Sequence, residues 1–209
     1  MNKKNEDKDK IEFKIITLGD SGVGKTSIIK RYVYNKFEYN SINTIGISYS
    51  FKDVILPNGQ KIQLKLIDTA GQEKYRSLSK SYFKHANGVF FIFSLNDPLT
   101  FQNIEQWVKD FNENKEDSKV ICQYLIGNKN DLEINVDQEL IEELKEKCNI
   151  KDYKPTSAKE NTNIGNIFDE MSQILYDNYS KKKKTNQKNL ELVKHKPEKK
   201  GCCLQQGDV

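Results

Sequence analysis

Residues 19–26 read Gly-Asp-Ser-Gly-Val-Gly-Lys-Thr and directly follow the apolar run 13–18. They match the spacing G-x-x-x-x-G-K-[ST], in which glycines let successive backbone N–H groups surround an anion. Lys25 adds a positive charge for the outer phosphates, and the Thr26 hydroxyl suits Mg2+, which prefers oxygen ligands. A glycine-rich turn without a ligand is the alternative. The motif predicts a phosphate site made of Asp20, Ser21, Gly22, Val23, Gly24, Lys25, Thr26 and Ser27.

A second polar block, residues 68–73, reads Asp-Thr-Ala-Gly-Gln-Glu and follows a β-rich run. Asp68 at a strand end can reach a Mg2+ shell through water, and the Gly71 amide can bond a terminal phosphate. Gln72 can orient an attacking water. Each residue alone reads as an ordinary polar loop residue. Six in a row downstream of a phosphate loop favour phosphoryl chemistry, with Gln72, Lys25 and Gly71 as the predicted catalytic residues.

A third block, Asn-Lys-Asn-Asp at 128–131, stands at the end of another apolar run. The Asp131 carboxylate can accept hydrogen bonds from the N1–H and the 2-amino group of guanine, a donor pair that adenine lacks. We expect Lys129 to lie along the nucleotide and Asn128 to brace the loop. Ser157, Ala158 and Lys159 form a weak motif alone, and beside the third block they offer a backbone amide to guanine O6.

The elements that hold these motifs follow from periodicity. Strands are expected at 13–18, 47–56, 61–67, 89–93 and 120–126, with another β-like stretch ending at Pro155. The sequence Pro-Asn-Gly-Gln at 57–60 predicts a hairpin that pairs two of them antiparallel. Helices are expected at 25–34, at 101–111, around 140–148, and from 164 to near Tyr179. Residues 36–44 are expected to form a loop.

Strands that alternate with helices predict an α/β fold with a six-stranded, mostly parallel sheet, one antiparallel strand and helices on both faces. Ligands of such sheets bind beyond the carboxyl ends of the strands, where all three polar blocks fall. Trp107 lies on the apolar face of the predicted helix 101–111, so we assign it to the core. Leu140, Ile141, Leu144 and Cys148 form the apolar face of the following helix.

Charge divides the chain of 209 residues into three parts. A charged, disordered leader is expected at 1–10, one globular domain at 11–180 and a flexible basic tail at 181–209. Nine lysines against three acidic residues give the tail a net charge of +6, which leaves −2 for the remainder. This distribution argues against a nucleic-acid-binding domain and favours an anionic membrane surface as the partner of the tail. A merely soluble tail is the alternative.

The cysteines fit a reducing compartment. Cys122 and Cys148 fall in a strand-like and a helical stretch, where buried or half-buried thiols are expected. No disulfide framework, signal peptide or apolar run long enough to span a membrane is apparent. Asn at position 2 excludes N-myristoylation.

The motifs, in this order and spacing, resemble those of the small GTPases of the Ras superfamily, from about residue 11 to 180. Gly-Asp-Ser-Gly-Val-Gly-Lys-Thr-Ser, Thr-Ile-Gly at 44–46, Asp-Thr-Ala-Gly-Gln-Glu-Lys-Tyr-Arg-Ser at 68–77 and a double cysteine near the end are most similar to Rab proteins. The resemblance implies a P-loop NTPase G domain that binds GTP/GDP with Mg2+. Thr44 would join Thr26 and Asp68 at the metal in the GTP state, and Phe37 would cover the guanine.

The same resemblance implies slow hydrolysis of GTP by a monomer that recruits effectors in vesicle trafficking. Its implied regulators are an exchange factor, a GTPase-activating protein and an escort or GDI-type chaperone. Tyr49, Ile67 and Tyr82 match the aromatic effector-binding triad of the family but differ from its usual residues, so standard partners are expected to fit poorly. We expect no arginine to act in cis on the phosphates.

The resemblance also implies lipidation of Cys202 and Cys203, although six residues follow them and no C-a-a-X box ends the chain. Prenylation is the expectation, with palmitoylation or a soluble protein as alternatives. Two lipids would anchor the chain on the cytoplasmic face of an intracellular membrane, from which it would cycle with the cytosol.

Two other functions compete with the GTPase reading. A nucleotide-locked scaffold would scarcely hydrolyse, but the retained Gly71 and Gln72 speak against it. A P-loop ATPase or kinase needs an adenine site, which the Asn-Lys-x-Asp block contradicts.

Overall fold

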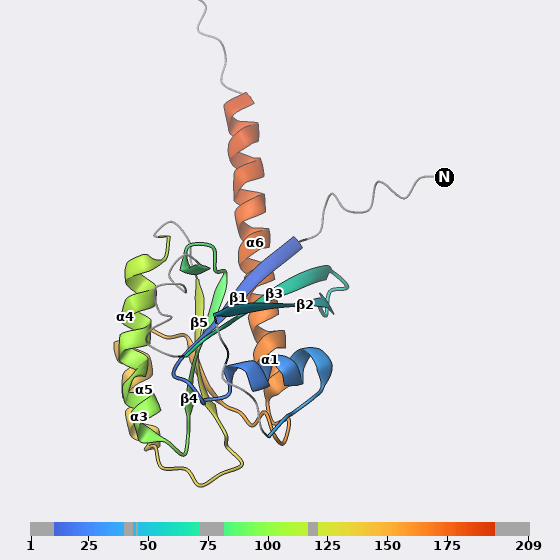
Figure 1. The fold of residues 1–209 in the computed structure, drawn as a ribbon. Coiled ribbons are helices and arrows are strands. Elements are labelled where there is room, and N and C mark those ends of the chain that lie inside the picture. The colour runs from blue at the N-terminus through green and yellow to red at the C-terminus, as the bar shows by residue number, and fades with distance from the viewer. Residues whose placement is uncertain (1–10, 40–43, 45, 72–81, 117–120, 195–209) are drawn as a thin grey trace, which may run out of the picture. The chain divides into compact units, whose positions relative to one another are not determined.

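The structure, a computed structural model, describes residues 11–39, 44, 46–71, 82–116 and 121–194, with the backbone alone for 186–194. In chain order the elements are β1 (Ile11–Leu18), α1 (Lys25–Tyr34), β2 (Ile47–Ile55), β3 (Lys61–Thr69), β4 (Gly88–Ser94), α3 (Pro98–Gln102), α4 (Ile104–Asn114), β5 (Cys122–Asn128), α5 (Gln138–Lys147), β6 (Asp152–Pro155) and α6 (Ile164–Lys194). Figure 1 shows the described helices on the two sides of the sheet. The predicted fold class is confirmed.

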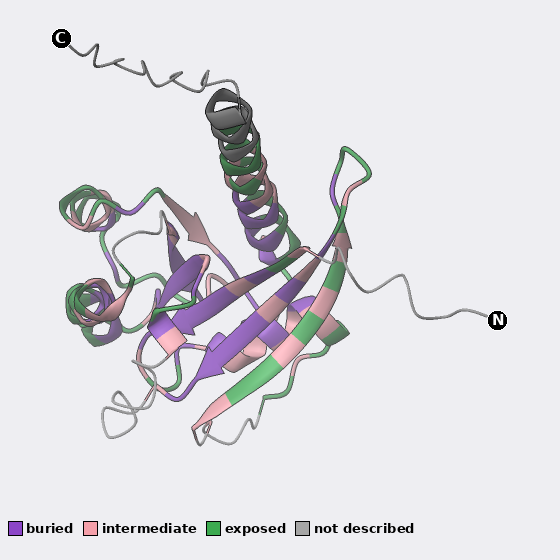
Figure 2. Ribbon diagram, turned by 90° about the horizontal axis from the view of Figure 1, so that it is seen from above, coloured by how far each residue is buried: buried purple, intermediate pink, exposed green. Residues whose placement is uncertain are grey.

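Six strands form one sheet in the order β2-β3-β1-β4-β5-β6. Every pair is parallel except β2 with β3, which run antiparallel. The predicted hairpin between them is confirmed, because the Leu56 amide donates to the Gln60 carbonyl at 2.9 Å. All seven residues of β4 are buried, as expected for a parallel strand that is covered on both faces. The edge strand β2 instead alternates exposed and half-buried residues (Figure 2).

The alternation of side chains along β4 divides the core into two layers. On one face Phe91 stacks edge-on against Phe111 of α4, with ring centroids 5.8 Å apart. On the other face Phe90 meets Phe168 of α6 at 5.1 Å, and that ring stacks on Tyr32 of α1 at 3.9 Å. The helices α1 and α6 therefore cover one face, and α3 to α5 cover the other.

Several element boundaries differ from the expectation. Strand β3 continues through Asp68 and Thr69, so the second polar block begins inside the sheet rather than in a loop. Strand β5 continues to Asn128, which places this residue at the carboxyl end of the strand. The helix predicted over 101–111 is interrupted at Asn103, yet its apolar residues are buried as predicted.

Helix α5 corrects one core prediction. Ile141 is 1% exposed and packs in the core, whereas Leu140 is 51% exposed. Adjacent residues on a helix point about 100° apart, and Ile141 faces the core while Leu140 lies beside the buried face. Asp137 caps the helix by accepting a hydrogen bond from the Glu139 amide at 2.8 Å, and Cys148 ends it with a half-buried thiol.

Helix α6 is longer than predicted. It was expected to close near Tyr179, but it continues through the lysines at 181–184 to Lys194. Residues 180–194 contain neither glycine nor proline, so nothing in the local sequence stops the helix. The chain separates into two compact units, residues 1–175 and 176–209, and the lysine side chains at 181–184 in the second unit are exposed. No described helix is long and apolar enough to cross a membrane.

Candidate nucleotide site

The glycine-rich stretch 19–26 joins β1 to α1, between a strand and a helix as predicted. Its lysine, Lys25, is only 5% exposed, and its Nζ donates to the carbonyls of Gly19 and Asp20 at 2.9 and 2.8 Å. Burial lowers the pKa of the Lys25 ammonium to about 8, although the negative charges of Asp68 and Asp20 act in the opposite direction. The charge is therefore held in place by carbonyl dipoles at the rim of the loop.

Three oxygen-bearing side chains meet beside this loop. The Thr26 hydroxyl donates to Asp68 Oδ2 at 2.6 Å and lies 2.7 Å from the Thr44 hydroxyl. Asp68 Oδ1 is buried and has no hydrogen-bond partner. Burial raises the pKa of this carboxyl, although the hydrogen bond from Thr26 and the charge of Lys25 oppose the rise. A buried carboxylate oxygen beside two hydroxyls is the donor set that a hard cation such as Mg2+ prefers.

The backbone of Gly71 packs against the phosphate loop at Asp20 and Ser21. A Cβ atom at this position would lie 2.3 Å from the backbone carbon of Asp20 and 2.4 Å from the Ser21 nitrogen. Only a residue without a side chain can bring its backbone this close. The next residue, Gln72, lies outside the described residues, so its predicted catalytic role stays a prediction.

Asn128 joins the glycine-rich loop to the segment 156–158. Its Nδ2 donates to the Val23 carbonyl at 2.8 Å, and its Oδ1 accepts from the Thr156 hydroxyl and the Ala158 amide, each at 3.2 Å. A Cβ on Gly24 would lie 2.3 Å from the same Nδ2, which explains a glycine there. Asn128 is thus the brace that the sequence predicted.

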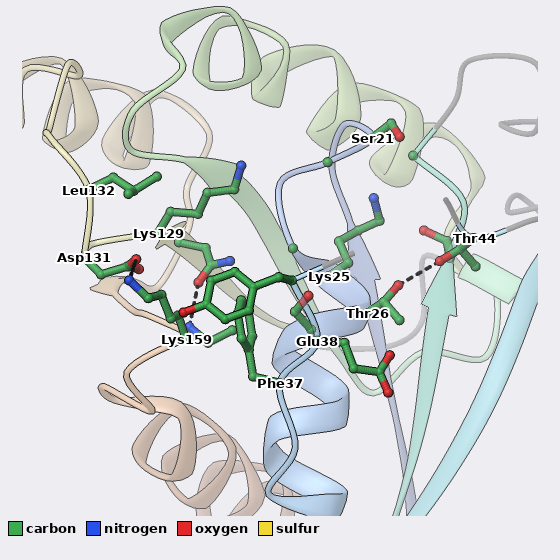
Figure 3. A pocket seen from close by; sticks show the side chains of 18 residues that line it. Ser21, Lys25, Thr26, Phe37, Glu38, Thr44, Lys129, Asp131, Leu132 and Lys159 are labelled. Atoms are coloured by element: carbon green, nitrogen blue, oxygen red, sulfur yellow. Dashed lines mark hydrogen bonds and ion pairs between the residues drawn. The ribbon is translucent and has the colours of Figure 1, made fainter. Parts of the chain in front are cut away.

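Asp131 lies at the far end of the cavity from Thr26 and Thr44 (Figure 3). Its Oδ1 accepts a hydrogen bond from Ser157 Oγ at 2.6 Å, and its Oδ2 lies 3.7 Å from the ammonium of Lys159. These contacts orient the carboxylate. The side chain of Lys129 extends along the cavity between the two ends (Figure 3).

Arg31 is a contributor that the sequence motifs did not reveal. From α1 its guanidinium donates to the carbonyls of Ala158 at 2.8 Å and Lys159 at 2.9 Å. It also lies 5.9 Å from the ring centre of Phe37, which contacts Tyr39 edge-on at 5.1 Å. Arg31 therefore holds the segment 158–159 at the Asp131 end of the cavity.

The cavity has a volume of about 340 Å3, in the range of small-molecule sites. Of the predicted binding residues, Asp20, Val23, Asp68 and Ser157 support it without lining it. Four lining residues were missed: Glu38, Tyr39, Thr69 and Leu132. The full lining is Ser21, Gly22, Gly24, Lys25, Thr26, Ser27, Phe37, Glu38, Tyr39, Thr44, Thr69, Gly71, Asn128, Lys129, Asp131, Leu132, Ala158 and Lys159.

The residues that match the effector triad also lie together. Tyr49 faces Ile67 across the antiparallel pair, and its ring centre lies 6.0 Å from that of Tyr82. A hydrogen bond with Tyr82 raises the pKa of Tyr49 to about 12, with smaller contributions from burial and charge. Ile67 is 2% exposed and Tyr49 is 42% exposed, so a partner would meet the tyrosine first. The ammonium of Lys65 lies 4.7 Å from the Tyr49 ring centre.

The chain matches the model of the Ras family over residues 14–177. It belongs to that family. The Ras-related protein RabC of Dictyostelium discoideum is 34% identical over 202 residues, covering 93% of this chain and 99% of the relative. The Ras-related protein SEC4 of Saccharomyces cerevisiae (strain ATCC 204508 / S288c) is 38% identical over 168 residues, covering 79% and 75%. The Ras-related protein Rab-13 of Bos taurus is 35% identical over 179 residues, covering 84% and 86%.

The chain is therefore a Rab-type small GTPase, which binds guanine nucleotides and hydrolyses GTP. Among the described residues no three His, Cys, Asp or Glu side chains gather as a metal site. The contacts among Thr26, Thr44 and Asp68 bring together one carboxylate and two hydroxyls.

Proposed function

We propose that this Rab-type GTPase is a GTP/GDP switch whose nucleotide lies in the cavity between residues 19–26, 128–131 and 157–159. The observation that carries the proposal is the convergence on one cavity of the buried Lys25, the hydroxyls of Thr26 and Thr44, and the Asp131 carboxylate. The phosphates lie along the loop near Lys25, and the guanine lies between Phe37 and Lys129. Its N1–H and 2-amino groups donate to Asp131, and the Ala158 amide donates to its O6.

Mg2+ fits beside the phosphates, because the buried Asp68 Oδ1 lacks a partner and two hydroxyls adjoin it. Thr26 and Thr44 would hold the ion directly and Asp68 through water, and the ion supplies charge neutralisation at the phosphate oxygens. Thr44 and Gly71 reach the cavity from segments outside the phosphate loop. If Thr44 and Gly71 both contact the terminal phosphate or its metal, their segments change position when that phosphate is lost.

Hydrolysis in this proposal depends on Gln72, which orients water in line with the terminal phosphate. Lys25 and the amide of Gly71 stabilise charge on the phosphoryl oxygens. Arg31 is engaged with the carbonyls of Ala158 and Lys159, so it does not serve the phosphate end. A GTPase-activating protein would supply the missing positive charge, which is worth roughly 10^3 to 10^5 in rate.

We further propose a role in vesicle trafficking, in line with the Rab-type relatives. The partners would be an exchange factor, an activating protein, effectors at Tyr49 and Tyr82, and an escort or GDI-type chaperone for the tail. Residues 11–180 form the GTPase domain, and Cys202 and Cys203 carry the lipids that place the monomer on the cytoplasmic face of an intracellular membrane. Both cysteines lie outside the described residues.

Single-turnover GTP hydrolysis with and without Mg2+ tests the proposal. Wild-type protein is expected to release phosphate slowly and only with Mg2+, and Gln72→Leu is expected to be slower still. A Gln72→Leu protein as fast as wild type would remove this residue from the mechanism. A wild type that retains GTP without measurable turnover would favour a nucleotide-locked scaffold.

A further inference from the structure

The side chain of Asp20 ties the phosphate loop to a distant part of the chain. Its Oδ1 accepts a hydrogen bond from the indole Nε1 of Trp107 at 2.8 Å. Its Oδ2 accepts from Nδ2 of Asn103 at 2.7 Å. The two donors stand 87 and 83 residues further along the chain, on α4 and at the break between α3 and α4. Both oxygens of one carboxylate are thus engaged by the same helical region.

The backbone of the same residue meets the two groups that act on the phosphates. The Asp20 carbonyl accepts from Nζ of Lys25 at 2.8 Å. The backbone of Gly71 packs so closely that a Cβ there would lie 2.3 Å from the Asp20 carbonyl carbon. A shift of Asp20 would therefore move the anchor of Lys25 and press against Gly71.

Trp107 is a rigid support for such an anchor. It is 1% exposed and belongs to the core layer that also contains Phe91 and Phe111. Its indole N–H is a donor that must find an acceptor when it is buried, and a carboxylate is a strong one. One hydrogen bond thus connects the buried Trp107 to the phosphate loop, whose glycines have positive φ angles.

We propose that Trp107 and Asn103 are positioning residues of the nucleotide site, which act through the Asp20 carboxylate to hold the phosphate loop and Lys25 in the binding geometry. The inference rests on the proposed placement of the phosphates. Under this proposal, the contacts of α4 with Asp20 slow the release of the bound nucleotide. The apolar periodicity of the sequence predicts only a core position for Trp107.

The rate of GDP release from the full chain in Mg2+ tests this coupling. Trp107→Phe keeps most of the ring volume but removes the donor, and Asp20→Ala removes the acceptor. Loss of one hydrogen bond to a charged group predicts about tenfold faster release in Trp107→Phe, and Asp20→Ala, which loses the bonds from both Trp107 and Asn103, should release GDP at least as fast. The double variant should release GDP no faster than Asp20→Ala alone, because the two residues act through one bond. Equal acceleration by Trp107→Phe in both backgrounds would overturn the proposal.

Asn103→Ala gives an independent arm, because this side chain is exposed and its loss does not disturb the core. Its acceleration of GDP release should likewise vanish in the Asp20→Ala background. Phe111→Leu is the matched control: it alters a fully buried ring on the same helix, which packs against Phe83 and Phe91. It should lower the melting temperature but leave GDP release within about twofold. Release as fast as in Trp107→Phe would mean that any damage to α4 suffices, which overturns the proposal.

Two results distinguish failure of the proposed phosphate site from failure of the coupling through Asp20. Wild-type protein that does not retain GDP would overturn the proposed phosphate site together with this inference. Tight GDP binding with independent, additive effects of Trp107 and Asp20 would overturn only the inference.

Discussion

At the scale of single residues, the site is a set of polar side chains held in place by hydrogen bonds to other polar groups. Lys25 is held by two carbonyls, and Asp131 by the Ser157 hydroxyl. Side chains held in this way lose less conformational freedom when a ligand binds. Asp68 is the exception, because its Oδ1 stays buried without a hydrogen bond.

The contact of Thr26 with Asp68 leads to a prediction for Thr26. Thr26→Ala removes one of the two hydroxyls beside the Asp68 carboxylate, whereas Thr26→Ser keeps it. We expect Thr26→Ala to need at least about tenfold more Mg2+ to slow GDP release, and Thr26→Ser to behave as wild type. A Mg2+ titration of the GDP release rate makes the comparison. An unchanged midpoint in Thr26→Ala would exclude this hydroxyl as a metal ligand.

At the scale of elements, helix α1 serves both ends of the cavity. Its first residues, Lys25 and Thr26, line the end proposed for the phosphates, and Arg31 donates to the carbonyls of Ala158 and Lys159 at the end proposed for the base. The planar guanidinium can reach two carbonyls at once, which a single ammonium cannot match. One helix thus sets the distance between the two ends.

Arg31→Ala is expected to speed GDP release about tenfold, because the loop at 158–159 loses two hydrogen bonds from a charged donor. Arg31→Lys should fall between this variant and wild type. Tyr34→Ala is the control on the same helix, since this side chain is exposed and is not among the residues that line the cavity. Stopped-flow release of a fluorescent GDP analogue gives the rates, and equal effects at positions 34 and 31 would refute the role of Arg31.

Helix α5 offers a test of packing. Ile141→Ala should lower the free energy of unfolding by about 2–5 kcal/mol, because the buried side chain leaves a cavity. Leu140→Ala should change it by no more than about 0.5 kcal/mol, because that side chain is half exposed. Urea denaturation of the GDP-bound proteins measures both. Comparable losses would mean that the helix is rotated relative to this description.

The sequence predicted what is local in the chain and missed what depends on tertiary contact. The phosphate loop and the Asn-Lys-x-Asp block could be recognised because their chemistry lies within a few consecutive residues. The contacts of Arg31 with Ala158 and of Trp107 with Asp20 join positions 127 and 87 residues apart. Either side chain alone reads as an ordinary helix residue, so no local pattern could reveal these roles.

At the scale of the whole molecule, the chain joins a nucleotide-binding domain to a basic helix and a pair of cysteines. Residues 181–184 are four exposed lysines inside α6, which suits contact with anionic lipid. Positive charge alone gives weak, salt-sensitive attachment, and two lipid chains make it stable.

Replacing both Cys202 and Cys203 by serine is therefore expected to move the protein from the membrane to the soluble fraction of cells that express it. Cys148→Ser, which removes a half-buried thiol of the domain, should leave the distribution unchanged. Fractionation followed by immunoblotting measures the split. Membrane association that survives the double substitution would refute lipid anchoring through this pair.

The central claim is that the cavity bounded by the phosphate loop and Asp131 selects guanine nucleotides. Competition of GTP and ATP for the purified, GDP-loaded protein tests it most directly, with Asp131→Ala beside wild type. The account predicts that GTP displaces GDP from wild type at concentrations lower than ATP by roughly 10^4 or more. In Asp131→Ala that preference should shrink by at least about a hundredfold. Equal displacement of GDP by GTP and ATP from wild type, or an undiminished preference in Asp131→Ala, would contradict it.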